Sequence, residues 1–255
     1  MSKTYDEKRV AERYDSAREL PEETRSLWMV SIKSIVPSRA VSSILDLGGG
    51  TGRFTKALHE AYGCPVAVLD PSIAMLKEGL KRRLKGVSWA CGRAEYIPVR
   101  DASFDFVWMC QVFHHLEDIQ QALREVYRVL KPAGYFAIRN GTIESDSEIE
   151  WARFFPEAQE IDRGRIPSQG QVINAVAHQG FALLEAGTVY QLAASNYAEY
   201  YEKISRRGLS SLISISDEAF NAGLRRFKDW ALRQPKNKPV SEAVDMFIFR
   251  RSGES

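Results

Sequence analysis

The sequence contains little cysteine. Three cysteines occur in 255 residues, at positions 64, 91 and 110, and no two of them form a Cys-x-x-Cys pair. This spacing predicts neither a disulfide framework nor a thiol-based metal site, and we expect no metal in the site at all. A reducing compartment suits such a chain, so the predicted location is cytoplasmic.

Long apolar runs and an excess of one charge are also missing. No apolar stretch approaches the roughly 20 residues of a membrane-spanning helix, and the charged segment Met1–Arg9 lacks a signal-peptide core. The net charge is only +2, so no overall field favours a nucleic acid or a membrane as partner. With 44% apolar and 27% charged residues, the composition is that of one globular domain, or of one domain with a lid.

The most informative segment that is present is a glycine-rich turn. An apolar strand, Ile44–Leu47, carries an acid at Asp46 and leads into Gly48, Gly49, Gly50 and Gly52. Glycine suits such a turn because a Cβ would hinder positive φ angles and the close approach of the backbone to a flat, nucleoside-like ligand. A carboxylate there repels a pyrophosphate and attracts a ligand with an ammonium and a sulfonium group. We interpret the turn as a binding loop for S-adenosylmethionine.

A nicotinamide dinucleotide is the alternative ligand for a turn of this kind. The spacing Gly-Gly-Gly-Thr-Gly differs from the dinucleotide pattern G-x-G-x-x-G, and Asp46 would oppose the pyrophosphate. The sequence therefore favours S-adenosylmethionine.

Strands and helices alternate through the first 140 residues. Strands are predicted at 44–47, 65–69, 87–91, 104–110 and 135–139, and later at 181–192 and 244–249. Such alternation is typical of a doubly wound parallel sheet, whose ligands bind beyond the carboxyl ends of the strands. Polar residues follow several of the predicted strands at that edge: Asp46, Asp70, Gln111, His114 and Asn140.

Five motifs, spread over about residues 10–140, resemble those of one enzyme family. The motifs are Leu45–Gly52, Leu69–Ser72 with Met75, Gly92–Pro98, Ser103–Asp105 followed by His114–Leu116, and Arg128–Pro132. In this order they resemble the class I S-adenosylmethionine-dependent methyltransferases, in the branch related to ubiquinone and menaquinone C-methyltransferases (methyltransferase type 11). The resemblance implies an α/β, Rossmann-like sheet of seven strands, mostly parallel, with an antiparallel last strand.

The resemblance also implies which residues bind S-adenosylmethionine, whose product would be S-adenosylhomocysteine. Asp46 and the glycine turn would hold the methionine end. Asp70 would accept hydrogen bonds from the two ribose hydroxyls, because a carboxylate is an acceptor facing two donors. Pro71 and Met75 would flank the adenine.

Further cofactor contacts follow from the same resemblance. Ala94 and Glu95 would lie at the edge of the adenine, and Gln111 would begin the loop under the sulfonium. Tyr14 and Arg18 would close over the methionine carboxylate.

The residues that would act on the acceptor are less specific. Methyl transfer from a sulfonium is an in-line displacement that chiefly requires alignment and the exclusion of water. A general base is needed only when the nucleophile carries a proton, and His114 and His115 are the candidates, although the pair also suits a loop-capping role. Arg139 and Asn140 could orient an anionic or carbonyl acceptor.

A helical insert is predicted between the last two strands. It occupies residues 193–236 and begins at the carboxyl end of the sixth strand, on the ligand side, so we expect a lid over the acceptor pocket. Tyr197, Tyr200 and Tyr201 at helical spacing are either substrate contacts or lid core. The expected units are an N-terminal helical cap (1–40), the cofactor-binding core (41–192 and 237–255) and the lid (193–236).

The predicted function is methyl transfer to a small-molecule acceptor. A tRNA or protein methyltransferase and a non-catalytic cofactor-binding protein remain alternatives, and Asp70 also suits a structural role at a helix N-terminus. Neither the acceptor nor the oligomeric state follows from the sequence.

Overall fold

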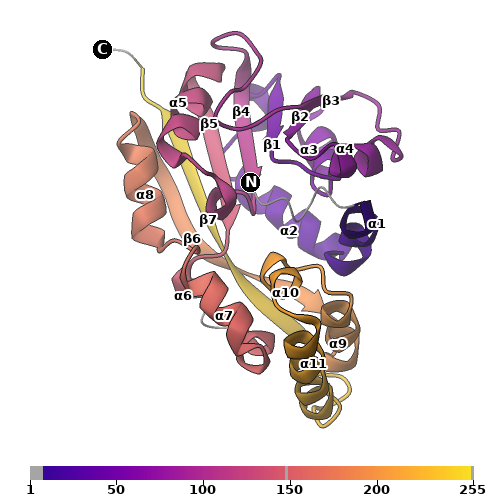
Figure 1. The fold of residues 1–255 in the computed structure, drawn as a ribbon. Helices are drawn as coiled ribbons and strands as arrows, with labels where there is room; N and C mark the ends of the chain where they lie inside the picture. The colour runs from indigo at the N-terminus through magenta and orange to yellow at the C-terminus, as the bar shows by residue number, and fades with distance from the viewer. Residues whose placement is uncertain (1–7, 147–148, 254–255) are drawn as a thin grey trace.

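The computed structural model describes residues 8–146 and 149–253. Within these residues one sheet contains seven strands in the order β3-β2-β1-β4-β5-β7-β6 (Figure 1). β1 to β5 are parallel, and β7 runs antiparallel to β5 and β6, which confirms the predicted fold class. The strands are β1 (Ile44–Leu47), β2 (Val66–Asp70), β3 (Val87–Cys91), β4 (Phe104–Cys110), β5 (Leu130–Asn140), β6 (Phe181–Ala194) and β7 (Val240–Arg251).

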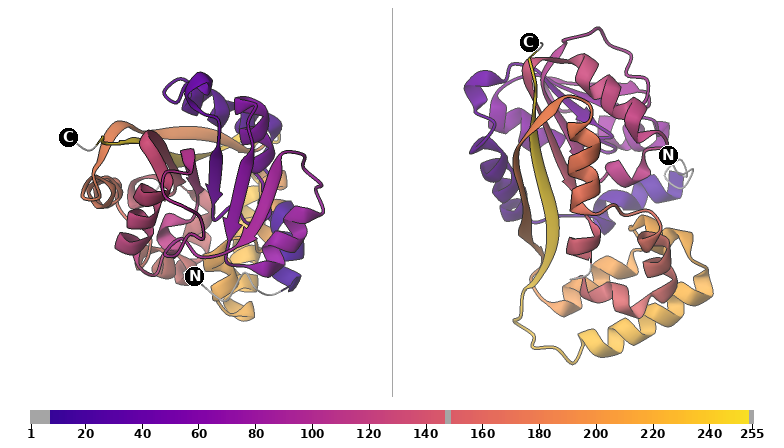
Figure 2. Two further views of the ribbon diagram at one scale, coloured as in Figure 1. Left: turned by 90° about the horizontal axis from the view of Figure 1, so that it is seen from above. Right: turned by 90° about the vertical axis from the view of Figure 1, so that its left-hand side faces the viewer.

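Helices cover both faces of this sheet (Figure 2). One hydrophobic cluster joins the sheet to α5 and α8, and a second joins it to α2 and α3. The core helices are α1 (Lys8–Ala17), α2 (Glu22–Lys33), α3 (Thr55–Tyr62), α4 (Ile73–Leu80), α5 (Ile119–Val129) and α8 (Gln169–Ala177), with the short 3-10 turns η2 (Ser38–Ala40) and η3 (Phe113–His115). Apolar faces of amphipathic helices therefore bury both sides of the strands.

Side-chain caps begin three of these helices. The Ser72 hydroxyl accepts from the Met75 N–H, and Ser168 forms a reciprocal capping box before α8. Asp118 caps α5, but the Gln121 side chain donates to the Glu95 carbonyl rather than returning to the cap.

Helix α4 ends at Leu80. The chain then turns at Arg83 (φ +50°) and again at Gly86 (φ +72°) before β3 begins at Val87.

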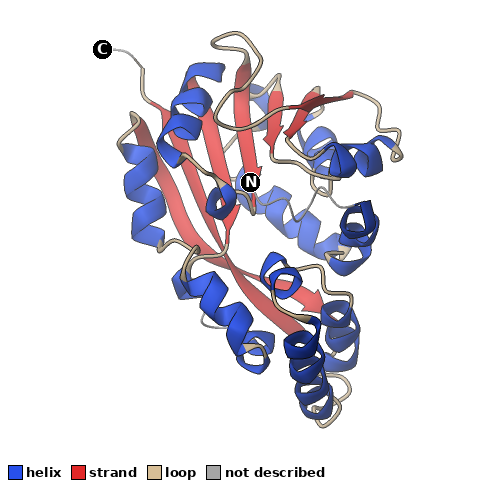
Figure 3. Cartoon of the chain, in the orientation of Figure 1, coloured by secondary structure: helices blue, strands red, loops and turns tan. Residues whose placement is uncertain are grey.

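A helical lobe lies below the sheet (Figure 3). We define it as η4 (Glu150–Phe154), α7 (Pro156–Arg163), α9 (Tyr197–Ser205), α10 (Ser210–Ser214) and α11 (Asp217–Ala231); the short α6 (Ile143–Asp146) leads into it. A third hydrophobic cluster fills the lobe, with Phe155 of the α7 segment packed against Phe220 of α11. The predicted insert thus packs together with residues that precede β6, and the extended ends of β6 and β7 carry it away from the sheet.

Candidate functional site

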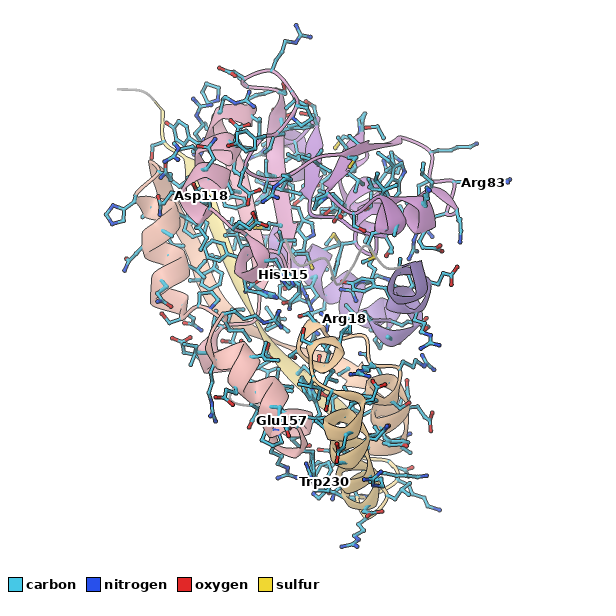
Figure 4. The ribbon with its side chains drawn as sticks, in the orientation of Figure 1. Arg18, Arg83, His115, Asp118, Glu157 and Trp230 are labelled. Atoms are coloured by element: carbon cyan, nitrogen blue, oxygen red, sulfur yellow. The ribbon has the colours of Figure 1, made fainter. Side chains whose placement is uncertain are left out.

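A cavity lies at the carboxyl ends of β1, β2, β4 and β5, between the sheet, α1 and the helical lobe. The space that it encloses up to its open mouth is about 1470 Å³, of which about 150 Å³ can be occupied by the centre of a water-sized sphere. Figure 4 shows Arg18 and His115 at this level, with the sheet above and the helical lobe below.

The glycine turn forms one wall of the cavity. A Cβ on Gly49 would lie 2.8 Å from Cγ of Asp46, and one on Gly48 would lie 2.3 Å from Val112. Gly48 and Gly50 also have positive φ angles of 69° and 57°, which side chains rarely tolerate. Gly52 does not line the cavity; it leaves space for the Trp89 ring, 2.5 Å from where its Cβ would be.

Asp46 is a buried carboxylate beside this turn. It is 2% exposed and its Oδ2 accepts a hydrogen bond of 2.6 Å from the Thr55 hydroxyl. Burial raises the pKa of Asp46 to about 7. A cationic ligand at this wall would favour the ionised form of the carboxyl group.

Asp70 holds the turn to the end of β2. Its Oδ2 accepts from the Gly50 N–H at 2.9 Å and its Oδ1 from the Ser72 N–H at 2.8 Å. Asp70 and Met75 both line the cavity. These bonds fix the carboxylate at the wall of the cavity.

A smaller pocket adjoins the cavity. Pro71, Ala94 and Glu95, which the sequence assigns to the adenine, line this pocket, and Gly48 and His115 line both spaces. The sequence analysis did not single out Val112, which also lines both. The only feature of the sequence that could have indicated Val112 as a lining residue is that this apolar residue directly follows Gln111.

The residues present fit S-adenosylmethionine. Two buried carboxylates, Asp46 and Asp70, flank a turn made of glycines, which have no side chains. Carboxylates attract a sulfonium and accept hydrogen bonds from ribose hydroxyls, whereas they repel a pyrophosphate. Gln111, which has a φ of +58°, lines the same cavity. Tyr14 and Arg18 of the α1 segment line it as well.

His114 faces the cavity in a defined tautomer. Its Nδ1 lies 3.0 Å from Oδ1 of Asn140. Because an amide oxygen only accepts, Nδ1 carries the proton and Nε2 keeps a lone pair. Burial and the Arg165 charge lower the pKa of His114 to about 4, so the ring is neutral at pH 7. Asn140 is fully buried and does not line the cavity, so it acts through His114.

His115 also lines the cavity. Its ring centroid is 4.1 Å from that of His114. Burial and the neighbouring His114 lower its pKa.

Arg139 and the lobe provide the remaining wall. Arg139 is 2% exposed and its guanidinium lies over the rings of Trp28 (4.7 Å) and Phe54 (5.3 Å). From the lobe side, Arg165 and Lys203 line the cavity. The sequence analysis named neither, because each comes from a segment without a recognisable motif.

The three lid tyrosines lie elsewhere. Tyr197 and Tyr200 are buried in the lobe cluster, and Tyr201 packs on Phe227. None of the three lines the cavity. The Tyr200 hydroxyl does reach Glu242, a cavity residue, at 2.7 Å. Helical periodicity predicted that these tyrosines share one face of a helix, but it did not indicate whether that face packs in the core of the lobe or lines the cavity.

The described residues form neither a metal-binding cluster nor a membrane-spanning helix. Within 8–146 and 149–253, no group of three or more His, Cys, Asp or Glu side chains could hold a metal ion. No helix in this part of the chain is long and apolar enough to cross a membrane.

The comparisons with known proteins identify one family. The model described as "Methyltransferase domain" matches residues 45–138. The chain is 36% identical over 147 residues to the ubiquinone/menaquinone biosynthesis C-methyltransferase UbiE of Rubrivivax gelatinosus, covering 57% of each protein. It is 30% identical over 171 residues to UbiE of Zymomonas mobilis, covering 65% of this chain and 68% of that protein. The chain thus spans little more than half the length of the first of these relatives.

Solved structures show the same fold at low identity. The phosphoethanolamine N-methyltransferase 2 of Haemonchus contortus, solved with S-adenosylhomocysteine, has a TM-score of 0.58 and 18% identity, over 89% of this chain and 53% of that one. The [4+2]-cyclase SpnF has a TM-score of 0.63 and 17% identity, over 93% and 85%. A cyclase among these structures means that the fold alone does not fix the reaction.

Proposed function

Because the chain belongs to the class I S-adenosylmethionine-dependent methyltransferases, in the UbiE-like branch, we propose that it transfers a methyl group from S-adenosylmethionine to a small-molecule acceptor. The observation that carries this proposal is one continuous cavity. Asp46, Asp70 and Gly48–Gly50 line it together with His114, Arg165 and Lys203.

Each wall would contribute a different part of the reaction. When bound, the cofactor supplies an electrophilic methyl group on a sulfonium. Asp46 would offset the positive charge, and Asp70 would fix the ribose. Because methyl transfer needs alignment more than acid–base chemistry, positioning of these groups is the main contribution of the chain.

His114 would orient the acceptor. With Nδ1–H donating to Asn140, Nε2 can accept a hydrogen bond from a hydroxyl or amine group of the acceptor. A ring with a pKa of about 4 is a weak base at pH 7, so we assign it positioning, and proton acceptance only where the nucleophile loses its proton during transfer.

Contact between α1 and the lobe beside the cavity supports a small acceptor over a tRNA or a protein. Nη1 of Arg206 donates to the Ser16 carbonyl at 2.5 Å, and Ala17 and Ile204, which lie nearby on α1 and α9, line the cavity. The relatives named above act in ubiquinone and menaquinone biosynthesis, but the family match ends at residue 138, before every element of the lobe. Their acceptor therefore does not transfer to this chain by the match alone.

Calorimetric titration with S-adenosylmethionine, S-adenosylhomocysteine and NAD tests the cofactor. We expect micromolar binding of the first two and none of NAD. Asp70→Ala should weaken binding by about 1.5–3 kcal/mol, the range for hydrogen bonds to a charged group. Asp101→Ala is the matched control, because that side chain is 77% exposed and lies outside the cavity.

Two results would contradict the proposal. Failure of both sulfur ligands to bind the wild-type protein would remove the cofactor. Cofactor binding without any methylated product, in a screen of small acceptors by product mass, would instead support the non-catalytic alternative.

A further inference from the structure

Arg139 is a buried cation that forms no direct ion pair with the residues the structure describes. Its Nη2 donates to Oε1 of Gln191 at 2.6 Å and its Nη1 contacts only the weakly accepting Sγ of Cys110 at 3.5 Å. Nε is buried and has no hydrogen-bond partner among the described residues. In the same part of the chain, no carboxylate lies within 4 Å of this guanidinium. Burying such a charge is costly unless an anion compensates it.

The carboxylates of the cavity compensate Arg139 only in part. Asp162 is paired with Arg165 at 2.6 Å. Glu242 accepts from the Tyr200 hydroxyl and, at 3.5 Å, from the Gln191 amide, and Lys203, Arg18 and Arg139 together lower its pKa, so Arg139 shares this one carboxylate with two other cations. Arg18 and Arg53 line the same cavity and add positive charge. The electrostatics around Arg139 therefore favour an anionic ligand.

The guanidinium is held in place before any ligand binds. Gln191 accepts from Arg139 and also from Nε1 of Trp28, at 2.8 Å. The aromatic rings of Trp28 and Phe54 support the planar group by cation–π contact. A fixed, planar guanidinium matches the geometry of a carboxylate, which it can bind through two parallel hydrogen bonds.

We propose that Arg139 binds a carboxylate of the methyl acceptor, which makes the acceptor an amphipathic carboxylic acid. The inference rests on the proposed function and names its substrate class. Arg139 lies at the end of β5, where Gln191 and Glu242 connect it to the lobe, apart from the α1 segment to which the methionine carboxylate is assigned above. Apolar residues of the lobe side, among them Ile149, Trp151 and Leu209, line the same cavity and suit an aromatic or aliphatic body.

Benzoate and its neutral isostere benzamide test the site. With S-adenosylhomocysteine at saturation, we expect the wild type to bind benzoate at least about tenfold more tightly than benzamide. A hydrogen bond between charged groups contributes enough free energy for such a difference in affinity. Arg139→Met should remove this preference and change the affinity for S-adenosylhomocysteine by less than about twofold. Arg139→Lys retains the positive charge but loses the planar guanidinium, so it should show an intermediate preference for benzoate over benzamide. This variant provides the test if Arg139→Met does not fold.

A matched control separates the site from a general effect of losing an arginine on aromatic rings. Arg153 also stacks on Phe154 and Trp230, at 4.9 and 4.5 Å, but lies outside the cavity. Arg153→Met should keep the preference for benzoate.

Three outcomes would overturn the proposal. The wild type could fail to prefer benzoate, or Arg139→Met could retain the preference. The third outcome assigns Arg139 to the cofactor: the variant would then lose affinity for S-adenosylhomocysteine but not for 5′-methylthioadenosine, which lacks the carboxylate. Failure of the proposed function is distinct, since the wild type would then not bind S-adenosylhomocysteine at all.

Discussion

Asp46 lies at the end of β1, where the fold withdraws its carboxyl group from water and raises its pKa to about 7. In the unfolded chain the same group titrates near 3.9. Between these values the folded protein keeps a proton that the unfolded chain has released. Stability from this group is therefore complete at low pH and falls as the pH rises towards 7.

Replacement of Asp46 by asparagine should remove this pH dependence. Asn mimics the protonated form, so the stability of Asp46→Asn relative to wild type should increase by about 2–3 kcal/mol between pH 5 and pH 8 in the ligand-free protein. Urea unfolding of both proteins at the two pH values measures the change. His114 and His115, whose lowered pKa values make stability rise with pH, are common to both proteins and cancel in the difference. Parallel pH curves would contradict the prediction.

At the scale of residues, the sequence predicted those positions whose role depends on their immediate neighbours. Asp46 and Asp70 lie at the carboxyl ends of β1 and β2, and the glycines follow β1 directly, so their location at the sheet edge could be inferred. Gln191, which holds Arg139, is 52 residues away from it along the chain. No local pattern indicates such a partner, because strand pairing and not sequence spacing brings the two together.

Among the elements, α1 and the loop after α9 are in close contact at Gly208. A Cβ on Gly208 would lie 2.2 Å from Cβ of Ala17. Gly208→Val should therefore displace α1, which contributes Tyr14 and Ala17 to the cavity and leads directly to Arg18. Overpacking destabilises a folded protein by about 1–3 kcal/mol. Because part of this free energy should oppose the docking of α1 over the ligand, we expect the affinity for S-adenosylhomocysteine to fall about fivefold or more.

Gly187→Val provides the matched control for this contact. Gly187 lies in β6, with nothing within 4 Å of its Cβ position, so valine should be accepted there without a change in affinity. Calorimetric titration of both variants gives the comparison. An unchanged affinity in Gly208→Val would show that α1 does not contribute to cofactor binding.

Element boundaries were predictable where a local signal sets them. β1, β3 and β4 begin and end at the predicted residues because turns or glycines flank them. β6 and β7 extend beyond their predicted ends, to Ala194 and from Val240, where they pair with each other. Such an extension depends on the partner strand, which the sequence of one strand does not contain.

For the whole molecule, the question is whether the lobe folds independently of the sheet. β6 and β7 run without interruption from the sheet into the lobe, and the lobe cluster includes Val240 at the start of β7. Buried polar bonds also continue across the junction, from Trp28 through Gln191 and Glu242 to Tyr200. These connections predict one cooperative unit rather than two.

Calorimetric unfolding with and without S-adenosylhomocysteine tests this cooperativity. A ligand at 100 times its Kd should add about 2.7 kcal/mol to the free energy of unfolding, and one transition should shift as a whole. An independent lobe would instead give two transitions, of which the ligand moves only the one that contains the glycine turn. Because α1, the sheet and the lobe all line the cavity, a ligand bound there should stabilise all three together. We therefore expect the lobe and the sheet to unfold in the same transition, whether or not the ligand is bound.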